Sequence, residues 1–359
     1  MTRDRSEAAL LAPQTPTAPA PVLSVRDLRT DYVMRGSVRT AVRGVSFDVQ
    51  PQERLAIVGE SGCGKSTLAL SLLRLIQPPG RITGGSVRFG GRDLLRLPDR
   101  KMRKVRGKGI SLIYQDPMAA LDPIKSIGTQ LIEAITEHQD VSRAVARRQA
   151  IDLLRDVEVP NAAQRLNDYP HQYSGGMRQR VVIAMALANQ PELLIADEPT
   201  TALDVTTQAQ ILDLIVRLVT DRSASMILIT HNLGLVAEYC TLVQVMYAGR
   251  VVERGTVDDL FANPRHPYTD ALIASVPRSS MDPGARLTTI PGVPPSLAAL
   301  PPGCAFEPRC SVGRGNPRCL AERPELRTLS GAGDGQAVEC HFPLHSPPVP
   351  ASHGGDPHV

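Results

Sequence analysis

The stretch GESGCGKS occupies residues 59–66 and fits the pattern G-x-x-x-x-G-K-[ST] at every fixed position. An apolar run, 55–58, precedes it and a helix-like run, 67–75, follows it, so we expect a strand, a glycine-rich loop and a helix in that order. Such a loop points successive backbone N–H groups at phosphate, and the start of the following helix adds a favourable dipole. The sequence therefore predicts a nucleoside triphosphate site here.

The predicted phosphate loop gives its polar residues separate tasks. Lys65 is expected to neutralise the β and γ phosphates, and the Ser66 hydroxyl to bind Mg²⁺. Cys63 is interpreted as a small side chain in a tight turn; the alternative is a redox-sensitive thiol, because a helix N-terminus can lower a thiol pKa. Many chemistries share such a loop, so it indicates only a P-loop nucleotide-binding protein. The predicted nucleotide-binding residues of the loop are Gly59, Ser61, Gly62, Cys63, Gly64, Lys65, Ser66 and Thr67.

The composition is that of a folded protein without a membrane-spanning helix. The chain has 359 residues, of which 42% are hydrophobic, and a formal net charge of +4. The apolar content suffices for a core, the length suits about two domains, and the small charge argues against a nucleic-acid partner. No apolar run approaches the roughly 18 residues that a membrane span needs, and no secretory leader is recognisable. We therefore expect a chain on the cytosolic side of the membrane.

The order of apolar and helical runs predicts an α/β domain with a mostly parallel sheet over residues 22–258. Further buried strands are expected at 193–196 and 227–230, each followed at once by polar residues, where parallel strands place ligands. A hairpin is expected over 243–253. Residues from about 116 to 185 have few strand signals and are expected to form a helical subdomain.

The two ends of the chain differ from this core in composition. Residues 1–21 and 343–359 are rich in proline and small residues, and we interpret both as disordered tails. Residues 259–342 are interpreted as a small irregular C-terminal extension.

Two adjacent carboxylates follow the predicted strand at 193–196. Asp197 is placed to bind Mg²⁺, and Glu198, on the other face of the chain, to polarise an attacking water. About twenty residues earlier, Ser174, Gly175 and Gly176 begin a helix-like run and offer a second anion site without a catalytic side chain. Either motif alone is an ordinary helix cap. With the phosphate loop present, the spacing favours function, with the second site closing over a γ-phosphate held by another chain.

Together these motifs resemble those of ABC ATPases over about residues 23–255. The signature reads YSGGM at 173–177, where the common family form is LSGGQ, so both flanks differ. The resemblance implies that ATP joins two chains head to tail. It also implies roles for four more residues: Gln115 senses Mg²⁺ and relays to a membrane partner, Asp204 belongs to the D-loop TALD, His231 contacts the γ-phosphate, and Tyr32 stacks on adenine.

Other segments resemble the ATPase subunits of oligopeptide and dipeptide importers. They are QDPMAALDP at 115–123, YSGGMRQR at 173–180 and NPRHPYT at 263–269, and the likeness extends to about residue 342. It implies a peripheral subunit on the cytoplasmic face of the membrane, with two permease subunits, a second ATPase subunit (identical or paralogous) and an extracytoplasmic solute-binding protein. The alternatives are a soluble ABC ATPase without a transport role, and the same importer subunit serving another solute such as nickel or glutathione.

Four of the six cysteines gather near the C-terminus. In a reducing cytosol this favours metal binding over disulfides, and four thiolates suit either an iron–sulfur cluster or Zn²⁺. The resemblance implies a 4Fe–4S cluster, with Zn²⁺ as the alternative. Residues 304–340 are expected to form a poor hydrophobic core alone, so that a bound metal would supply the stability that packing cannot. The overall prediction is a P-loop ABC ATPase core of α/β class with a helical subdomain and a small metal-bearing extension. The predicted cluster ligands are Cys304, Cys310, Cys319 and Cys340.

Overall fold

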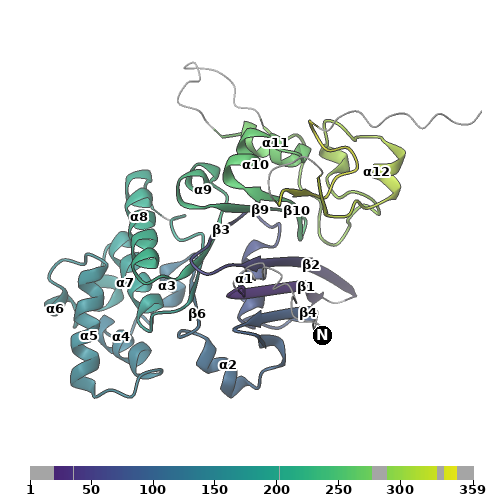
Figure 1. Ribbon diagram of the computed structural model, residues 1–359. Coiled ribbons are helices and arrows are strands. Elements are labelled where there is room, and N and C mark those ends of the chain that lie inside the picture. The colour runs from purple at the N-terminus through teal and green to yellow at the C-terminus, as the bar shows by residue number, and fades with distance from the viewer. Residues whose placement is uncertain (1–19, 35, 202, 277–288, 330–334, 346–359) are drawn as a thin grey trace, which may run out of the picture.

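A computed structural model describes residues 20–34, 36–201, 203–276, 289–329 and 335–345 (Figure 1). Most of both predicted tails lies outside these residues. Within the described part of the chain, no helix is long and apolar enough to cross a membrane.

In the described part of the chain, the large sheet has eight strands in the order β11-β12-β10-β9-β3-β8-β7-β6. The central strands β3, β7 and β8 are short apolar runs buried on both faces, the pattern of a covered parallel sheet. They confirm the predicted strands, and the β9–β10 pair confirms the predicted hairpin. The strands are β3 (Arg54–Val58), β6 (Ile110–Ile113), β7 (Leu193–Asp197), β8 (Ser225–Thr230), β9 (Leu242–Tyr247), β10 (Arg250–Thr256), β11 (Arg327–Thr328) and β12 (Ala337–Val338).

The register of the parallel strands brings their carboxyl ends to one edge of the sheet. Val58 at the end of β3 pairs with Thr230 at the end of β8. On the other side of β8, Asp197 at the end of β7 pairs with Ile229. The polar residues that follow these three strands therefore start from neighbouring points, although more than a hundred residues separate β3 from β7.

A second, antiparallel sheet of four strands lies beside the first, in the order β2-β1-β4-β5 (Figure 1). Its inner face packs against α1 through a core that includes Leu28, Phe47 and Leu68. The strands are β1 (Leu23–Met34), β2 (Ser37–Val49), β4 (Gly80–Phe89) and β5 (Arg92–Asp93).

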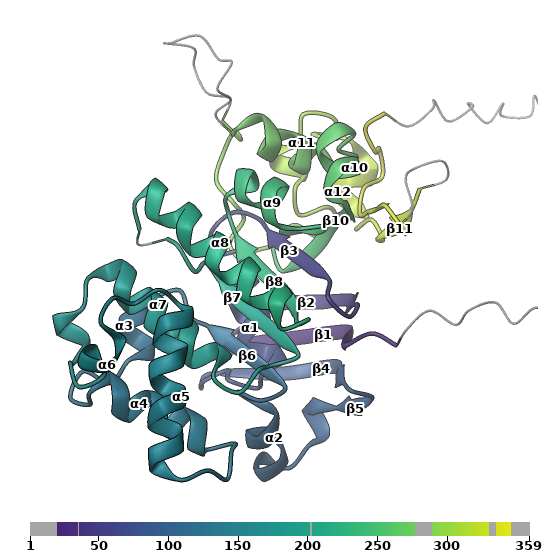
Figure 2. The ribbon, with the colours of Figure 1, turned by 60° about the vertical axis from the view of Figure 1, so that its left-hand side comes forward.

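Helices cover the sheets and form a separate group at one end of the molecule. From 117 to 187 the described chain forms helices and no strand, and Figure 2 shows this group at the end opposite α11 and α12. Serine caps the three longer helices of the group: Ser126 before α4, Ser142 before α5 and Ser174 before α7. The helices are α1 (Lys65–Leu72), α2 (Asp99–Val105), α3 (Pro117–Ala120), α4 (Ile127–Thr136), α5 (Arg143–Asp156), α6 (Ala162–Arg165), α7 (Gly175–Leu187), α8 (Val205–Asp221), α9 (Leu233–Tyr239), α10 (Val257–Ala262), α11 (Pro267–Ala274) and α12 (Pro317–Ala321).

The C-terminal extension is less irregular than predicted. Its strands β11 and β12 continue the large sheet, with Val338 of β12 pairing with Glu253 of β10. Phe306 is 2% exposed, and its ring centroid lies 5.2 Å from that of Tyr247 and 5.3 Å from that of Tyr268. The extension does not rely on a core of its own, because Phe306 and Cys310 belong to the apolar core of the large sheet.

Candidate functional site

The phosphate loop joins the end of β3 to the start of α1. Gly64 is the N-cap of α1, and no side chain accepts a hydrogen bond from the first N–H groups of the helix. These N–H groups are therefore available to bind an anion. Its φ is +106°, and a Cβ at this position would collide with the carbonyl oxygen of Ala41. Only glycine lets the loop approach β2 this closely. The local sequence thus shapes the loop for phosphate.

A cavity opens over this loop and is lined from both sheets. Tyr32 and Arg39 come from the antiparallel sheet, Gln115 and Glu198 follow strands of the large sheet, and Leu297 comes from the C-terminal extension. Tyr32 therefore lies where stacking on a nucleotide base is feasible. Residues of the loop and of α1 also line the cavity: Ser61, Gly62, Gly64, Lys65, Ser66 and Thr67.

Gly59 and Cys63, also predicted to bind nucleotide, are not among the residues that line this cavity. Cys63 is 5% exposed, and burial raises its pKa. A raised pKa reduces the thiolate fraction, which argues against the redox-sensitive alternative and for a small buried side chain. A Cβ on Gly59 would collide with the Met246 carbonyl oxygen, so this position serves close packing against β9.

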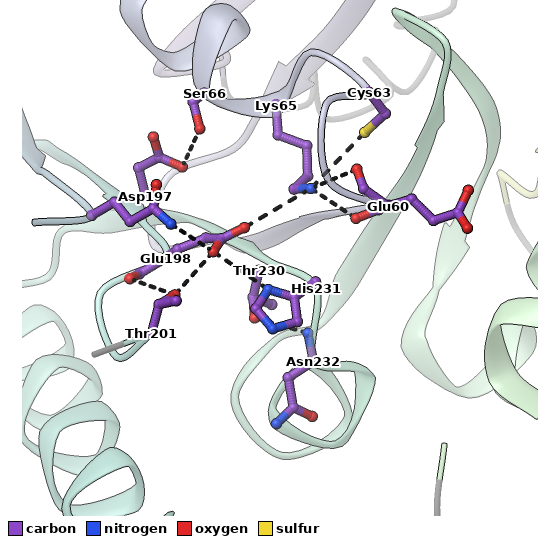
Figure 3. A network of polar contacts seen from close by, with 12 residues as sticks. Glu60, Cys63, Lys65, Ser66, Asp197, Glu198, Thr201, Thr230, His231 and Asn232 are labelled. Carbon is purple, nitrogen blue, oxygen red and sulfur yellow. Dashed lines mark hydrogen bonds and ion pairs between the residues drawn. The ribbon is translucent and has the colours of Figure 1, made fainter. Parts of the chain in front are cut away.

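Glu198 is the centre of a polar network at the carboxyl edge of the large sheet (Figure 3). Its Oε2 accepts hydrogen bonds from Gln115 Nε2 at 3.2 Å and from Thr201 Oγ1 at 2.9 Å. His231 Nδ1 lies 3.4 Å from the same oxygen, and Lys65 Nζ lies 4.0 Å from Oε1. Residues that follow β3, β6, β7 and β8 thus converge on one carboxylate.

The backbone at Glu198 is held in an unusual conformation. Its φ is +45°, in the left-handed region, and its N–H donates to the Ile229 carbonyl at 2.9 Å. A non-glycine residue in this region costs of order 1–3 kcal/mol and is found at functional sites when its surroundings enforce it. Here the strain turns the Glu198 side chain toward the phosphate loop, while Asp197 keeps the regular strand direction.

Asp197 and Ser66 form the second half of the site. Ser66 Oγ donates to Asp197 Oδ1 at 3.1 Å, and burial raises the Asp197 pKa despite this bond. A hydroxyl and a carboxylate are oxygen ligands suited to Mg²⁺, which usually completes its shell with water and substrate phosphates. Over the described residues, no group of three or more His, Cys, Asp or Glu side chains is arranged to hold a metal ion by itself.

The signature and D-loop residues lie outside the cavity lining. Ser174 caps α7 by accepting the Met177 N–H at 3.4 Å, with Gly175 and Gly176 in the first turn. Asp204 caps α8, and the Thr207 backbone N–H, which it accepts at 3.0 Å, lowers its pKa. Ala202, also part of the predicted D-loop, is outside the described residues. Within one chain Ser174 and Asp204 act as helix caps and do not line the phosphate cavity.

The four C-terminal cysteines line one small cavity. The Gly313 N–H donates to Cys310 Sγ at 3.1 Å, and a Cβ on Gly313 would lie 2.8 Å from Cys319 Sγ. Burial raises the pKa of Cys304 to about 11 and that of Cys340 to about 12. The fold therefore brings together thiols that are up to 36 residues apart in sequence, counted from Cys304 to Cys340.

Several contacts of the site were missed in the sequence. Thr201 donates a hydrogen bond to the Glu198 carboxylate. It belongs to the D-loop motif, but the sequence predicted no role for it. Arg39 and Leu297 line the cavity but belong to no recognisable sequence motif. Arg309 and Tyr268 of the extension bind Glu60, and the signal for them was Glu60 itself: a carboxylate in a phosphate-binding loop needs a cation beside it.

Comparisons with known proteins agree with this geometry. Residues 42–201 match the family model described as ABC transporter, and residues 252–319 match that of the oligopeptide/dipeptide transporter C-terminal region. The chain is 52% identical to a probable peptide ABC transporter ATP-binding protein of Sinorhizobium fredii, over 89% of this chain and 94% of that one. It is 51% identical to the dipeptide transport ATP-binding protein of Bacillus subtilis, over 80% and 86%.

Solved structures with a similar fold belong to the same class of protein. An ATP-binding cassette in a dimeric post-hydrolysis state with ADP and phosphate superposes with a TM-score of 0.59 at 26% identity, covering 66% of this chain and 98% of that one. The fold and the site thus define an ABC ATPase. The chain belongs to the family of peptide ABC transporter ATP-binding proteins.

Proposed function

We propose that this ATPase powers a peptide importer and that Glu198 is the base that activates the attacking water. The observation that carries the proposal is the convergence of Lys65, Gln115, Thr201 and His231 on the Glu198 carboxylate. Phosphoryl transfer depends on positioning and charge neutralisation, and these groups supply both at the phosphate loop.

Each side chain of the site has a proposed role. Lys65 neutralises the β and γ phosphates, and His231 contacts the γ-phosphate. Ser66 and Asp197, with Gln115 beside them, hold Mg²⁺, whose charge would offset that of the phosphates. Tyr32 stacks on the adenine ring, since it lines the same cavity.

The site requires a second chain. Ser174, Gly175 and Gly176 start a helix but do not line their own chain's cavity, so we propose that they bind the γ-phosphate held by the partner chain. Asp204 lies at the start of α8, and we propose that its loop contacts the partner too. ATP would then close a head-to-tail dimer, and a single chain would be nearly inactive.

The test is the substitution Glu198→Gln, which keeps the shape and removes the base. We expect Mg–ATP binding to persist while kcat for hydrolysis falls at least a hundredfold, the lower bound for losing a general base. Glu192→Gln, an exposed position just before β7, is the matched control and should keep wild-type turnover. Wild-type turnover by Glu198→Gln would disprove the base assignment.

The proposed cargo is an oligopeptide or a dipeptide. Its support is the names of the relatives and the match of residues 252–319 to the oligopeptide/dipeptide transporter region. The proposed assembly has two permeases, a second ATPase subunit and an extracytoplasmic binding protein, with this chain peripheral on the cytoplasmic face. Residues 22–258 would form the nucleotide-binding domain and 259–342 the extension.

The assembly can be tested by isolating the tagged chain from gently solubilised membranes. Recovery of two permeases with a second ATPase subunit is the expected result. Recovery of soluble partners alone, while other transporters stay intact, would favour an ABC ATPase without a transport role.

We further propose that Cys304, Cys310, Cys319 and Cys340 hold a 4Fe–4S cluster. All four line one cavity, and the Gly313 N–H bonds Cys310 Sγ, a type of contact that tunes such clusters. The cysteines are separated by five, eight and twenty residues and so lack the C-x₂-C pairs of common zinc sites, which with the family resemblance favours the cluster over Zn²⁺. The chemistry that it would supply is one-electron transfer or a structural cross-link.

A further inference from the structure

Glu60 places a carboxylate inside a loop that is shaped to bind phosphate. It is the second residue of the loop 59–66, and like charges at short range oppose anion binding. Figure 3 shows its carboxylate directed away from Lys65, while its backbone carbonyl accepts from Lys65 Nζ at 3.1 Å. The side chain must therefore be held outside the phosphate cavity by some other group.

Arg309 of the C-terminal extension is that group. Its Nη1 lies 2.6 Å from Glu60 Oε2 and its Nη2 lies 2.9 Å from Glu60 Oε1, a two-bond pair that fixes both distance and orientation. The Arg309 side chain is 4% exposed, compared with 24% for Glu60. Its Nε donates to the Pro291 carbonyl at 2.8 Å, and Nη1 also reaches Tyr247 Oη at 3.3 Å. The guanidinium is thus held by two contacts besides those to Glu60.

Tyr268 holds the backbone of the same residue. Its hydroxyl oxygen accepts the Glu60 N–H at 2.9 Å, and its side chain is fully buried. The ring is placed by α11, whose N-cap His266 accepts the Tyr268 N–H at 3.0 Å through Nδ1. Tyr268, the last residue of the HPY sequence at 266–268, therefore contacts the phosphate loop. Glu60 is held at its side chain and at its backbone by residues more than 200 positions away in sequence.

The position of Glu60 also affects Lys65, the lysine proposed to bind phosphate. Lys65 Nζ donates to the Gly59 carbonyl at 2.7 Å as well as to that of Glu60. A shift of Glu60 would move both carbonyls and allow its charge to turn toward the cavity. Holding a binding loop in its bound form lowers the ordering cost when the ligand arrives.

We propose that Arg309 and Tyr268 are positioning residues for ATP: acting through Glu60, they keep the phosphate loop open and its carboxylate turned away from the phosphates. The inference rests on the proposed ATPase function and deepens it, because it makes the C-terminal extension part of the nucleotide site. The extension also reaches the same cavity directly through Leu297.

The test compares full-length variants in binding of a non-hydrolysable ATP analogue with Mg²⁺ and in steady-state ATPase kinetics. Arg309→Gln and Tyr268→Phe should each raise the Kd of the analogue and the KM for ATP about tenfold, the effect of freeing roughly one loop residue. Because neither side chain reaches the reacting atoms, kcat at saturating ATP should change less than threefold. Glu60→Gln removes the partner, so adding Arg309→Gln to it should weaken binding little further.

Arg250→Gln is the matched control. Arg250 Nε lies 2.7 Å from Glu339 Oε1 in an ion pair of similar burial that also ties the core to the extension, but it does not touch the phosphate loop. It should lower the melting temperature without raising the Kd. An equal rise of the Kd in Arg250→Gln would overturn the inference by showing general loosening.

The remaining outcomes are also decisive. Unchanged Kd in Tyr268→Phe and Arg309→Gln, with ATP binding intact in the wild type, would overturn the inference and leave the ATPase function standing. No binding by the wild type would instead overturn the proposed function. If Arg309→Gln does not fold, Tyr268→Phe still decides, because it removes only the hydroxyl that accepts the Glu60 N–H.

Discussion

Gln115 Nε2 donates a hydrogen bond to Glu198 Oε2 across 3.2 Å, and so joins the segment that follows β6 to the end of β7. The two residues are 83 positions apart in sequence. The segment after Gln115 leads into α3 and the helical group, which Figure 2 shows at the end opposite α11 and α12. A movement of that group would therefore reach the Glu198 carboxylate directly.

Replacing Gln115 with alanine should slow hydrolysis more than it weakens ATP binding. The variant loses a hydrogen bond to a charged group, worth about 1.5–3 kcal/mol, so kcat should fall roughly ten- to a hundredfold. Steady-state kinetics with purified full-length chain measure this, and Gln164→Ala on the exposed face of α6 is the control. A wild-type kcat in Gln115→Ala would show that the contact has no part in the reaction.

Serine in place of Cys310 should remove iron and sulfide from anaerobically prepared protein. The cluster would lose one thiolate and, with it, the hydrogen-bonded sulfur beside Gly313. Iron and acid-labile sulfide are measured per chain, together with the visible absorbance. Cys240→Ser, buried but remote from the cysteine cavity, should keep wild-type contents. Unchanged iron in Cys310→Ser would refute the ligand assignment, and zinc in the wild type would favour the alternative metal.

His266 should make the chain less stable as the pH falls. Burial lowers its pKa to about 3 from an ordinary value of 6.5. The unfolded chain therefore takes up a proton below about pH 6.5 that the folded chain does not, so this stability is complete above that pH and is lost on acidification. His266→Asn keeps a side-chain acceptor for the Tyr268 N–H and removes the titration.

The free energy of urea unfolding at pH 7, 6 and 5 checks this. Between pH 6 and 5, the wild type should lose about 1.2 kcal/mol more than His266→Asn. The difference between the two proteins isolates His266 from the buried Glu253, whose raised pKa acts in the opposite sense. His171→Asn, at an exposed position, should follow the wild type. Parallel pH profiles for the wild type and His266→Asn would contradict the prediction.

Alanine in place of Phe306 should destabilise the ATPase core together with the extension. The ring is 2% exposed among Tyr247, Tyr268 and His266, so its removal should cost about 3–5 kcal/mol of unfolding free energy. Val293→Ala, at an 84% exposed position in the extension, should stay within about 0.5 kcal/mol of the wild type. A separate early transition that leaves the core transition unchanged would show two independent units.

Much of the fold and of the candidate site was predictable because the signals are local. The phosphate loop is a short pattern whose glycines and following helix shape it within a few residues. The strands at 55–58, 193–196 and 227–230 are apolar runs, and Asp197 and Glu198 follow one of them. Ser174 and the helix that it begins follow from capping rules, which act over three residues.

The tertiary structure alone decided which of these residues touch. The strand order β3-β8-β7-β6 brings Lys65, His231 and Gln115 to the Glu198 carboxylate. No periodicity in the sequence predicts that strand order. Arg309 meets Glu60 across 249 positions, and Phe306 of the extension is buried against Tyr247 of β9. Propensity and capping act over a few residues, whereas burial and ion pairing depend on which distant surfaces pack together. The extension's part in the nucleotide site therefore became visible only in the folded chain.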